Sequence, residues 1–128
     1  SRGRTDLHSE PIASVAVQLQ GSKQWTLVSA AHSSLLRPSP SPDGRAYFFS
    51  DLSNEEIERV PQRVSVVTRP GDALWVPPWT WHAVRYDGYS VSASLFHFKP
   101  MAFASQHPAF ALAVLPNLVK EIAGWKTQ

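Results

Sequence analysis

The chain has 128 residues, of which 43% are hydrophobic and 17% are charged, and it contains no cysteine. This length suits one globular domain, and the lack of cysteine excludes disulfides, iron–sulfur clusters, thiolate zinc sites and cysteine nucleophiles. The formal net charge is only +2 and the arginines are scattered along the sequence, so nucleic acid is not favoured as a partner.

The sequence also lacks the signals of a membrane protein. No apolar run approaches the roughly 20 residues that a membrane-spanning helix needs. Residues 1–4 have no apolar segment behind them that could form a signal peptide. We therefore expect a soluble protein with no membrane partner. The compartment stays open, because a chain without cysteine suits both reducing and oxidising surroundings; the cytoplasm or nucleus is our expectation.

The first predicted elements form a β-hairpin. Residues 13–20 alternate with period two, which is typical of a strand with one buried face. Gly21 and Ser22 provide a turn, and residues 23–29 return as the second strand. Between residues 33 and 61 the pattern changes. Residues 39–44 predict a loop, and we expect its part at 39–42 to border the mouth of a substrate site. Residues 45–49 predict a short strand. Ser53 and Glu56 then have the spacing of a capping box, which predicts one helical turn.

Four more strands are predicted in the second half. Residues 64–68 and 73–76 flank a Pro-Gly-Asp turn at 70–72, and residues 82–86 and 89–98 flank the hairpin signal Asp87-Gly88. Residues 108–125 are rich in Ala, Leu and Val, and Pro116 is expected to divide them into two helices, each begun by a proline.

This order of elements predicts a mainly β fold. Six or seven short strands with turns at close spacing favour a small barrel or a double-sheet jelly roll, with the helices packed outside it. We expect a β-barrel domain over residues 1–100 and a helical tail over residues 101–128.

Three residues form a candidate metal site. His8 and Glu10 are two apart in extended chain, so their side chains point to the same side, and His82 opens a later strand. Two histidines and one carboxylate are the facial triad of non-haem Fe(II) oxygenases, which leaves open positions on the metal. The pair His8 and Glu10 is weak evidence by itself, because such a spacing often occurs by chance.

The surrounding pattern resembles the Jumonji-C family of Fe(II) and 2-oxoglutarate dependent dioxygenases. The resemblance is to its cupin-like branch, which contains the asparaginyl hydroxylase that inhibits hypoxia-inducible factor. Members of that branch have the pattern T-x-x-H-x-D, then G-x-K-[RK]-aromatic, and later P-G-D-x-L-aromatic-[IV]-P-x-x-W-W-H. This chain has TDLHSE at 5–10, GSKQW at 21–25 and PGDALWVPPWTWH at 70–82. The resemblance covers about residues 5–98 and implies a double-stranded β-helix, the cupin fold.

The resemblance also implies roles for single residues. His8, Glu10 and His82 match the iron ligands, and Lys23 matches the lysine that binds the distal carboxylate of 2-oxoglutarate. Thr5 matches a hydroxyl that assists that carboxylate. The implied activity is oxidative decarboxylation of 2-oxoglutarate with O2, coupled to hydroxylation of a substrate or to demethylation.

The chain departs from the branch in three places. Glu10 stands where the branch usually has Asp, although histone demethylase relatives use Glu. Ser94 stands where the asparaginyl hydroxylase has an Asn near the metal, so we expect it beside the cosubstrate. The strands and helices that precede the first motif in the family have no counterpart before Thr5, which suggests a minimal domain or a piece of a longer chain.

Other interpretations stay open. The chain could be a non-catalytic cupin that binds a metal or ligand. A cupin isomerase or a dioxygenase that uses no 2-oxoglutarate is disfavoured, since such sites usually gather three or four histidines. The remaining histidines are expected in other roles: His32 at a loop surface, His97 on a strand and His107 beside a helix cap. The tryptophans are expected to pack inside the barrel rather than form an aromatic cage; they are Trp25, Trp75, Trp79, Trp81 and Trp125.

The sequence leaves the substrate undetermined. A protein and a small molecule both fit the resemblance, because fold does not choose among the substrates of such a family. The apolar tail either caps its own barrel or forms a homodimer through the C-terminal helices, as in the branch it resembles.

Overall fold

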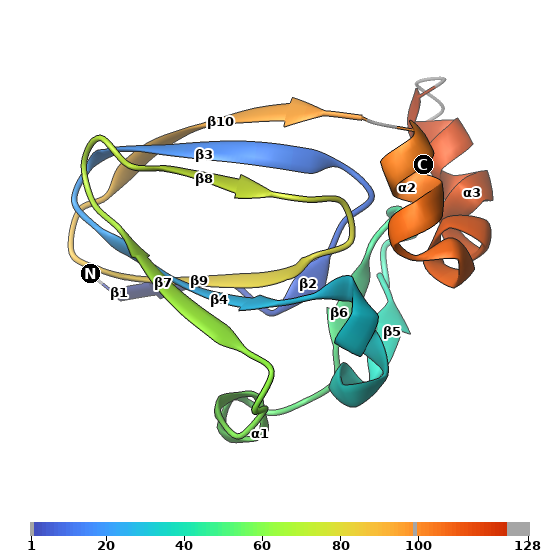
Figure 1. Cartoon of the computed structure of the whole chain (residues 1–128), viewed down its shortest axis with the longest axis horizontal. Coiled ribbons are helices and arrows are strands. Elements are labelled where there is room, and N and C mark those ends of the chain that lie inside the picture. The colour runs from blue at the N-terminus through green and yellow to red at the C-terminus, as the bar shows by residue number, and fades with distance from the viewer. Residues whose placement is uncertain (1, 99, 123–128) are drawn as a thin grey trace.

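The computed structural model describes residues 2–98 and 100–122, which form two antiparallel sheets that face each other, with helices at one end (Figure 1). The strands of the larger sheet are β1 (Arg2–Arg4), β2 (His8–Ser9), β4 (Lys23–Val28), β5 (Pro38–Pro40), β6 (Phe48–Ser50), β7 (Val64–Thr68) and β9 (Trp81–Asp87). Their order is β5-β6-β2-β9-β4-β7, with β1 added to β9. The mainly β, double-sheet fold predicted from the sequence is confirmed.

The smaller sheet and the helices complete the described chain. The strands of the smaller sheet are β3 (Ala13–Gln20), β8 (Ala73–Val76) and β10 (Val91–His97), in the order β10-β3-β8. The helices are the 3-10 helix η1 (Ala30–Leu36), α1 (Asn54–Glu58), α2 (Pro100–Gln106) and α3 (Pro108–Ile122). No helix in the described part of the chain is long and apolar enough to cross a membrane.

The two sheets enclose a small apolar core. Ala16 and Val76 from the smaller sheet meet Trp25 and Val84 from the larger one. Because side chains alternate along a strand, Lys23 and Leu27 point to the same inner side as Trp25, whereas the residues between them point outward. The inner face of β4 therefore lines the space between the sheets, and its outer face lies on the far side of the larger sheet.

A second core lies between the end of the larger sheet and the C-terminal helices. Trp79 and Trp81 are fully buried there, and Phe110 of α3 packs against both rings. This arrangement explains the position of the helices in Figure 1, because they cover the end of the sheet where the two tryptophans lie.

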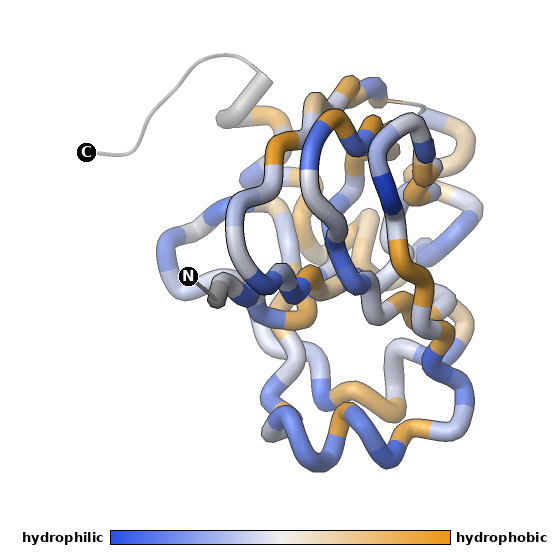
Figure 2. The backbone as a smooth tube through the Cα atoms, turned by 90° about the vertical axis from the view of Figure 1, so that its left-hand side faces the viewer, coloured by the Kyte–Doolittle hydropathy of each residue, from blue (hydrophilic) through white to orange (hydrophobic). Residues whose placement is uncertain are grey.

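The hairpin turns lie at the opposite end of the sheets, the left-hand end in Figure 1 and the near end in Figure 2. Gly21 has φ of 67°, and a Cβ on it would lie 2.2 Å from the carbonyl oxygen of Tyr89. The turn between β3 and β4 thus packs tightly against the turn between β9 and β10, and glycine is required there.

Most local predictions are confirmed. The strands over 13–20, 64–68 and 73–76 have the predicted bounds, and the others differ by a few residues at most. The capping box is present: the Glu56 N–H donates to Ser53 Oγ, and the Ser53 N–H donates to Glu56 Oε2. His107 lies at the cap of α3, where its Nδ1 accepts a hydrogen bond from the Phe110 N–H.

Three local predictions are wrong. Pro116 lies inside the continuous helix α3 and does not divide it, because Phe110 and Val114 bury the preceding turns against the core; the break falls at His107 instead. Part of the predicted loop 39–44 belongs to the edge strand β5, which pairs with β6, and proline is tolerated at such an edge. Finally, His32 lies half-buried within η1 rather than at a loop surface.

The packing prediction for the tryptophans is met in part. Trp25, Trp79 and Trp81 are buried, the last two beneath the helices rather than inside the barrel. Trp75 is 53% exposed because it points outward from β8. Trp125 lies outside the described residues.

Candidate metal centre

Neighbouring strands bring His8 and His82 together. β2 pairs with β9, and His8 lies directly opposite His82 in the register. The centroids of the two imidazole rings are 4.3 Å apart. Glu10 follows His8 by two residues, so its side chain returns to the same side of the chain.

The three side chains converge on one point. His8 Nε2 lies 2.8 Å and His82 Nε2 lies 3.9 Å from Glu10 Oε1. One ligand atom from each residue falls within 4.8 Å of the others, which is a spacing that a single metal ion could bridge. The three predicted ligands are thus brought together by the fold.

Backbone carbonyls orient both imidazole rings. His8 Nδ1 lies 2.8 Å from the carbonyl oxygen of Asp6, and His82 Nδ1 lies 3.0 Å from that of Thr80. A carbonyl only accepts, so Nδ1 carries the proton in each ring and donates it. Both Nε2 atoms are therefore turned toward Glu10: the Nε2–H of protonated His8 donates to Glu10 Oε1 over 2.8 Å, and loss of that proton would free the Nε2 lone pair for a metal ion.

The charges of the three groups are coupled. Burial opposes a charge on His8, but the hydrogen bond to Glu10 and the carbonyl of Asp6 outweigh it and raise the pKa of His8. Burial lowers the pKa of His82, and the neighbouring His8 lowers it further. Burial acts to raise the pKa of Glu10, yet the two histidines lower it overall. A carboxylate held ionised beside two imidazoles is a donor set that suits a divalent cation.

A buried contact ties the two ligand-bearing segments together. Ser9, between His8 and Glu10, has no exposed surface, and its hydroxyl donates to the carbonyl of Trp79 over 2.9 Å. The Trp79 N–H donates to the carbonyl of Glu10 over 2.7 Å. Trp79 has φ of 64°, a conformation that costs a bulky residue about 1–3 kcal/mol and persists where the surroundings over-determine it.

An open cavity of about 440 Å³ lies beside the metal group. His8 and Glu10 line it, and next to them Tyr47 and Phe49, whose rings are 5.1 Å apart, form an aromatic wall. Arg45 also lines this cavity and pairs with Asp43 over 3.0 Å. Sequence reasoning missed these residues. The only signal was the short strand predicted at 45–49, which supplies them.

Lys23 lies between the two sheets. Its Nζ donates to Ser92 Oγ, which belongs to β10 of the opposite sheet. On the inner face of β4, Lys23 is followed by Trp25 and Leu27, and Leu27 lies opposite His82 in the register. Lys23 and the metal group therefore lie on one inner face, separated along the strand by about 13 Å at ~3.3 Å per residue.

The other two predicted cosubstrate residues have different surroundings. Ser94 shares the face of β10 that bears Ser92 and is exposed. The Thr5 hydroxyl accepts a hydrogen bond from the Val84 N–H, and Thr5 lines the cavity beside the metal group. The structure thus places Thr5 near the metal group. Thr5 bonds to the backbone of Val84, whereas Lys23 bonds to Ser92.

A comparison with protein families agrees with the fold. The model of the cupin-like domain family matches residues 1–103. The chain belongs to the cupin-like domain family. The match covers both sheets, all three residues of the metal group and Lys23, so this cupin-like domain contains the whole candidate site.

Proposed function

We propose that this cupin-like domain is an Fe(II) and 2-oxoglutarate dependent oxygenase that hydroxylates C–H bonds, including those whose hydroxylation leads to demethylation. The observation that carries the proposal is the set of His8, Glu10 and His82 on paired strands with both Nε2 atoms turned toward one carboxylate. This donor set is the facial triad, which leaves positions on the metal for further ligands. Iron bound there would supply oxidation by O2 at the expense of 2-oxoglutarate.

Lys23 is the proposed anchor of the cosubstrate. An inward-pointing cation between two sheets is costly unless an anion or polar groups satisfy it. Ser92 now accepts one hydrogen bond from Lys23, and an ammonium group has three to give. The distal carboxylate of 2-oxoglutarate would accept another, while its 2-oxo acid end faces the metal group at the other end of the inner face.

The open cavity lined by the aromatic wall is the proposed entrance for substrate. Tyr47 and Phe49 stand on the open side of the metal group, and each ring lies 6.2 Å from the ring of His8. They would orient a substrate by apolar contact and exclude water from the reacting bond. Residues 39–42, just before this wall in the chain, remain the proposed lip.

The C-terminal helices are the proposed dimer contact. Leu112, Leu115 and Val119 lie along one side of α3 and are 76%, 45% and 52% exposed. Sedimentation of the chain and of the variant Leu112→Glu tests this proposal. We expect the native chain to sediment as a dimer and the variant as a monomer, whereas a monomeric native chain would contradict it.

The test of activity is succinate formation from 2-oxoglutarate with Fe(II) in air. We expect turnover that is abolished in His82→Ala and retained in His97→Ala, a histidine outside the metal group. Metal binding without any succinate formation would instead favour a cupin that binds ligands but does not catalyse. Turnover unaffected by His82→Ala would contradict the proposed site.

A further inference from the structure

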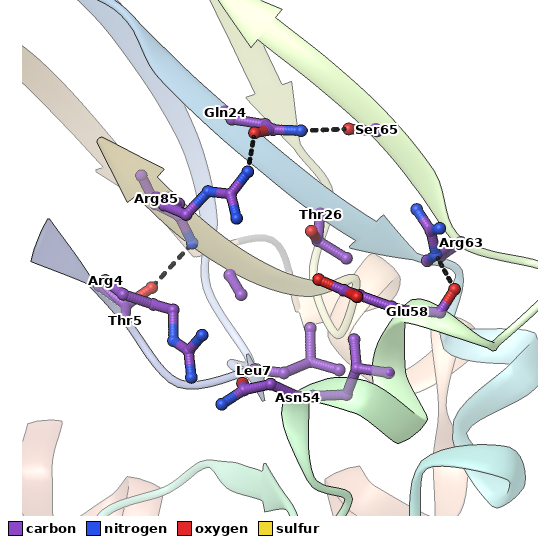
Figure 3. A pocket seen from close by; sticks show the side chains of 13 residues that line it. Arg4, Thr5, Leu7, Gln24, Thr26, Asn54, Glu58, Arg63, Ser65 and Arg85 are labelled. Carbon is purple, nitrogen blue, oxygen red and sulfur yellow. Dashed lines mark hydrogen bonds between the residues drawn. The ribbon is translucent and has the colours of Figure 1, made fainter. Parts of the chain in front are cut away.

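A second cavity, of about 230 Å³, lies on the outer face of the larger sheet (Figure 3). Gln24 and Thr26 reach it from β4, and Ala83 and Arg85 reach it from β9. These residues alternate with Trp25, Val84 and their inward-pointing neighbours, so they lie on the face of the sheet that points away from the metal group, and Thr5 lines both this cavity and the one beside that group. Helix α1 closes its far side with Asn54, Ile57 and Glu58.

Three arginines surround this cavity. Arg4 and Arg85 extend from one side and Arg63 from the other, where Glu58 is the only carboxylate among the lining residues (Figure 3). Arg4 lies directly opposite Arg85 in the register between β1 and β9. Like charges placed opposite each other across two strands destabilise a sheet, so this pair needs a compensating partner.

Few groups of the protein itself offset the positive charge of these three arginines. Arg85 donates to Gln24 Oε1 over 2.7 Å, and Gln24 donates to Ser65 Oγ over 3.2 Å. Arg63 donates its Nε–H to the backbone carbonyl of Glu58 over 2.8 Å. Among the described residues, none of the three arginines forms an ion pair with a carboxylate. Most of their N–H groups are therefore available to an oxyanion, which guanidinium groups bind in a fork geometry.

The floor of the cavity is apolar. Leu7 is buried beneath it, and Ile57 and Ala83 add partly buried side chains. Positive charge around the rim with an apolar floor is complementary to a molecule that joins an anionic group to a short apolar group.

We propose that this cavity binds a small organic oxyanion, a phosphate or carboxylate attached to a short apolar group. The oxyanion lies between Arg4 and Arg85 and relieves their repulsion, and its apolar part contacts Leu7 and Ile57. The site is independent of the oxygenase proposal, since it needs neither the metal nor 2-oxoglutarate.

The test is a titration of the metal-free chain with phenyl phosphate and with phthalate, followed by the backbone amide resonances of residues 4–7 and 83–85. Binding at millimolar concentration or below supports the proposal, and the tighter of the two probes tells whether phosphate or carboxylate is preferred. We expect Arg4→Gln to weaken binding about tenfold, which is the effect of removing one charged hydrogen-bond donor. We expect Glu58→Gln to strengthen it, because this change removes the carboxylate that repels the ligand.

One control separates this site from general attraction to a basic protein. Arg69→Gln removes the same charge at an exposed position away from the cavity. This variant should bind the probes as the native chain does. The proposal is overturned if neither probe shifts the resonances of these residues, or if Arg69→Gln weakens binding as much as Arg4→Gln.

Discussion

The hydroxyl of Ser9 donates a hydrogen bond to the carbonyl of Trp79 and thereby joins the strand that bears His8 to the loop that precedes His82. The Trp79 N–H returns a hydrogen bond to the carbonyl of Glu10. Trp79 is also anchored to α2, because its Nε1–H donates to the carbonyl of Phe103 over 2.9 Å. The distance between the metal-binding segments is thus set by buried hydrogen bonds next to the ligands.

Ser9→Ala should lower the free energy of unfolding by about 1–3 kcal/mol, because the buried carbonyl of Trp79 loses its side-chain donor. Urea denaturation measures this change. Ser34→Ala, at an exposed position of η1, is the matched control and should have little effect. Equal stability of the two variants would show that the Ser9 contact does not hold the segments together.

Glu10→Gln should weaken the binding of Mn(II) by about tenfold or more, because it replaces a charged ligand by a neutral amide oxygen. Calorimetry on the metal-free chain measures the affinity. Glu55→Gln, on the exposed face of α1, removes the same charge elsewhere and should leave the affinity unchanged. If Glu10→Gln binds Mn(II) as tightly as the native chain, the ion is held by other groups.

Lys23→Ala should abolish the binding of 2-oxoglutarate to the Mn(II)-loaded chain and leave Mn(II) binding intact, since the lysine is the proposed partner of the distal carboxylate. Ser92→Ala is the control variant, because it removes the hydrogen-bond partner of Lys23 but keeps the lysine cation. We expect Ser92→Ala to retain binding. Undiminished binding in Lys23→Ala would contradict the proposed anchor.

His107 should make the stability of the C-terminal helices depend on pH. Burial lowers the pKa of His107 below its ordinary 6.5, and the neutral Nδ1 accepts the hydrogen bond that caps α3. A lowered pKa means that the folded state disfavours the proton. The stabilisation that this hydrogen bond gives to the folded state is therefore complete above the pKa of His107 in the unfolded chain. It is lost as the pH falls through the pKa of His107 in the folded chain.

His107→Asn checks this pH dependence, because an asparagine can cap the helix without titrating. The native chain should lose about 1 kcal/mol relative to the variant between neutral and mildly acidic pH, which is the usual contribution of a helix cap. Urea denaturation of both proteins across this range measures the difference. A difference that does not change with pH would show that protonation of His107 leaves the cap intact.

Pro116→Ala should raise both the helix content and the melting temperature, because proline inside a helix removes a backbone hydrogen bond and clashes with the preceding turn, at a cost of up to about 3 kcal/mol. Pro108→Ala is the matched control. Pro108 is the first residue of α3, where proline is favourable, so its replacement should not stabilise the protein. Circular dichroism on heating distinguishes the two, and equal effects would contradict this account.

Local sequence patterns correctly predicted the strands and the helix whose formation depends mainly on neighbouring residues. The alternation in 13–20, the β-branched run 64–68 and the capping box of Ser53 and Glu56 each depend on neighbours in sequence, and each is found where it was predicted. Pro116 shows the limit of such reasoning. Its effect on the backbone is local, but the burial of Phe110 and Val114 against distant tryptophans keeps the helix continuous.

The sequence by itself determined the double-sheet fold and the residue types of the metal group. Strand periodicity and the spacing of His8, Glu10 and His82 can be observed without knowing how the chain folds. Only the tertiary structure decided what lies around them. The register of β1 against β9 places Arg4 opposite Arg85, and the pairing of β2 with β6 brings an aromatic wall to His8. Arginines that are scattered in the sequence therefore form one cavity, because strand pairing joins residues that are far apart along the chain.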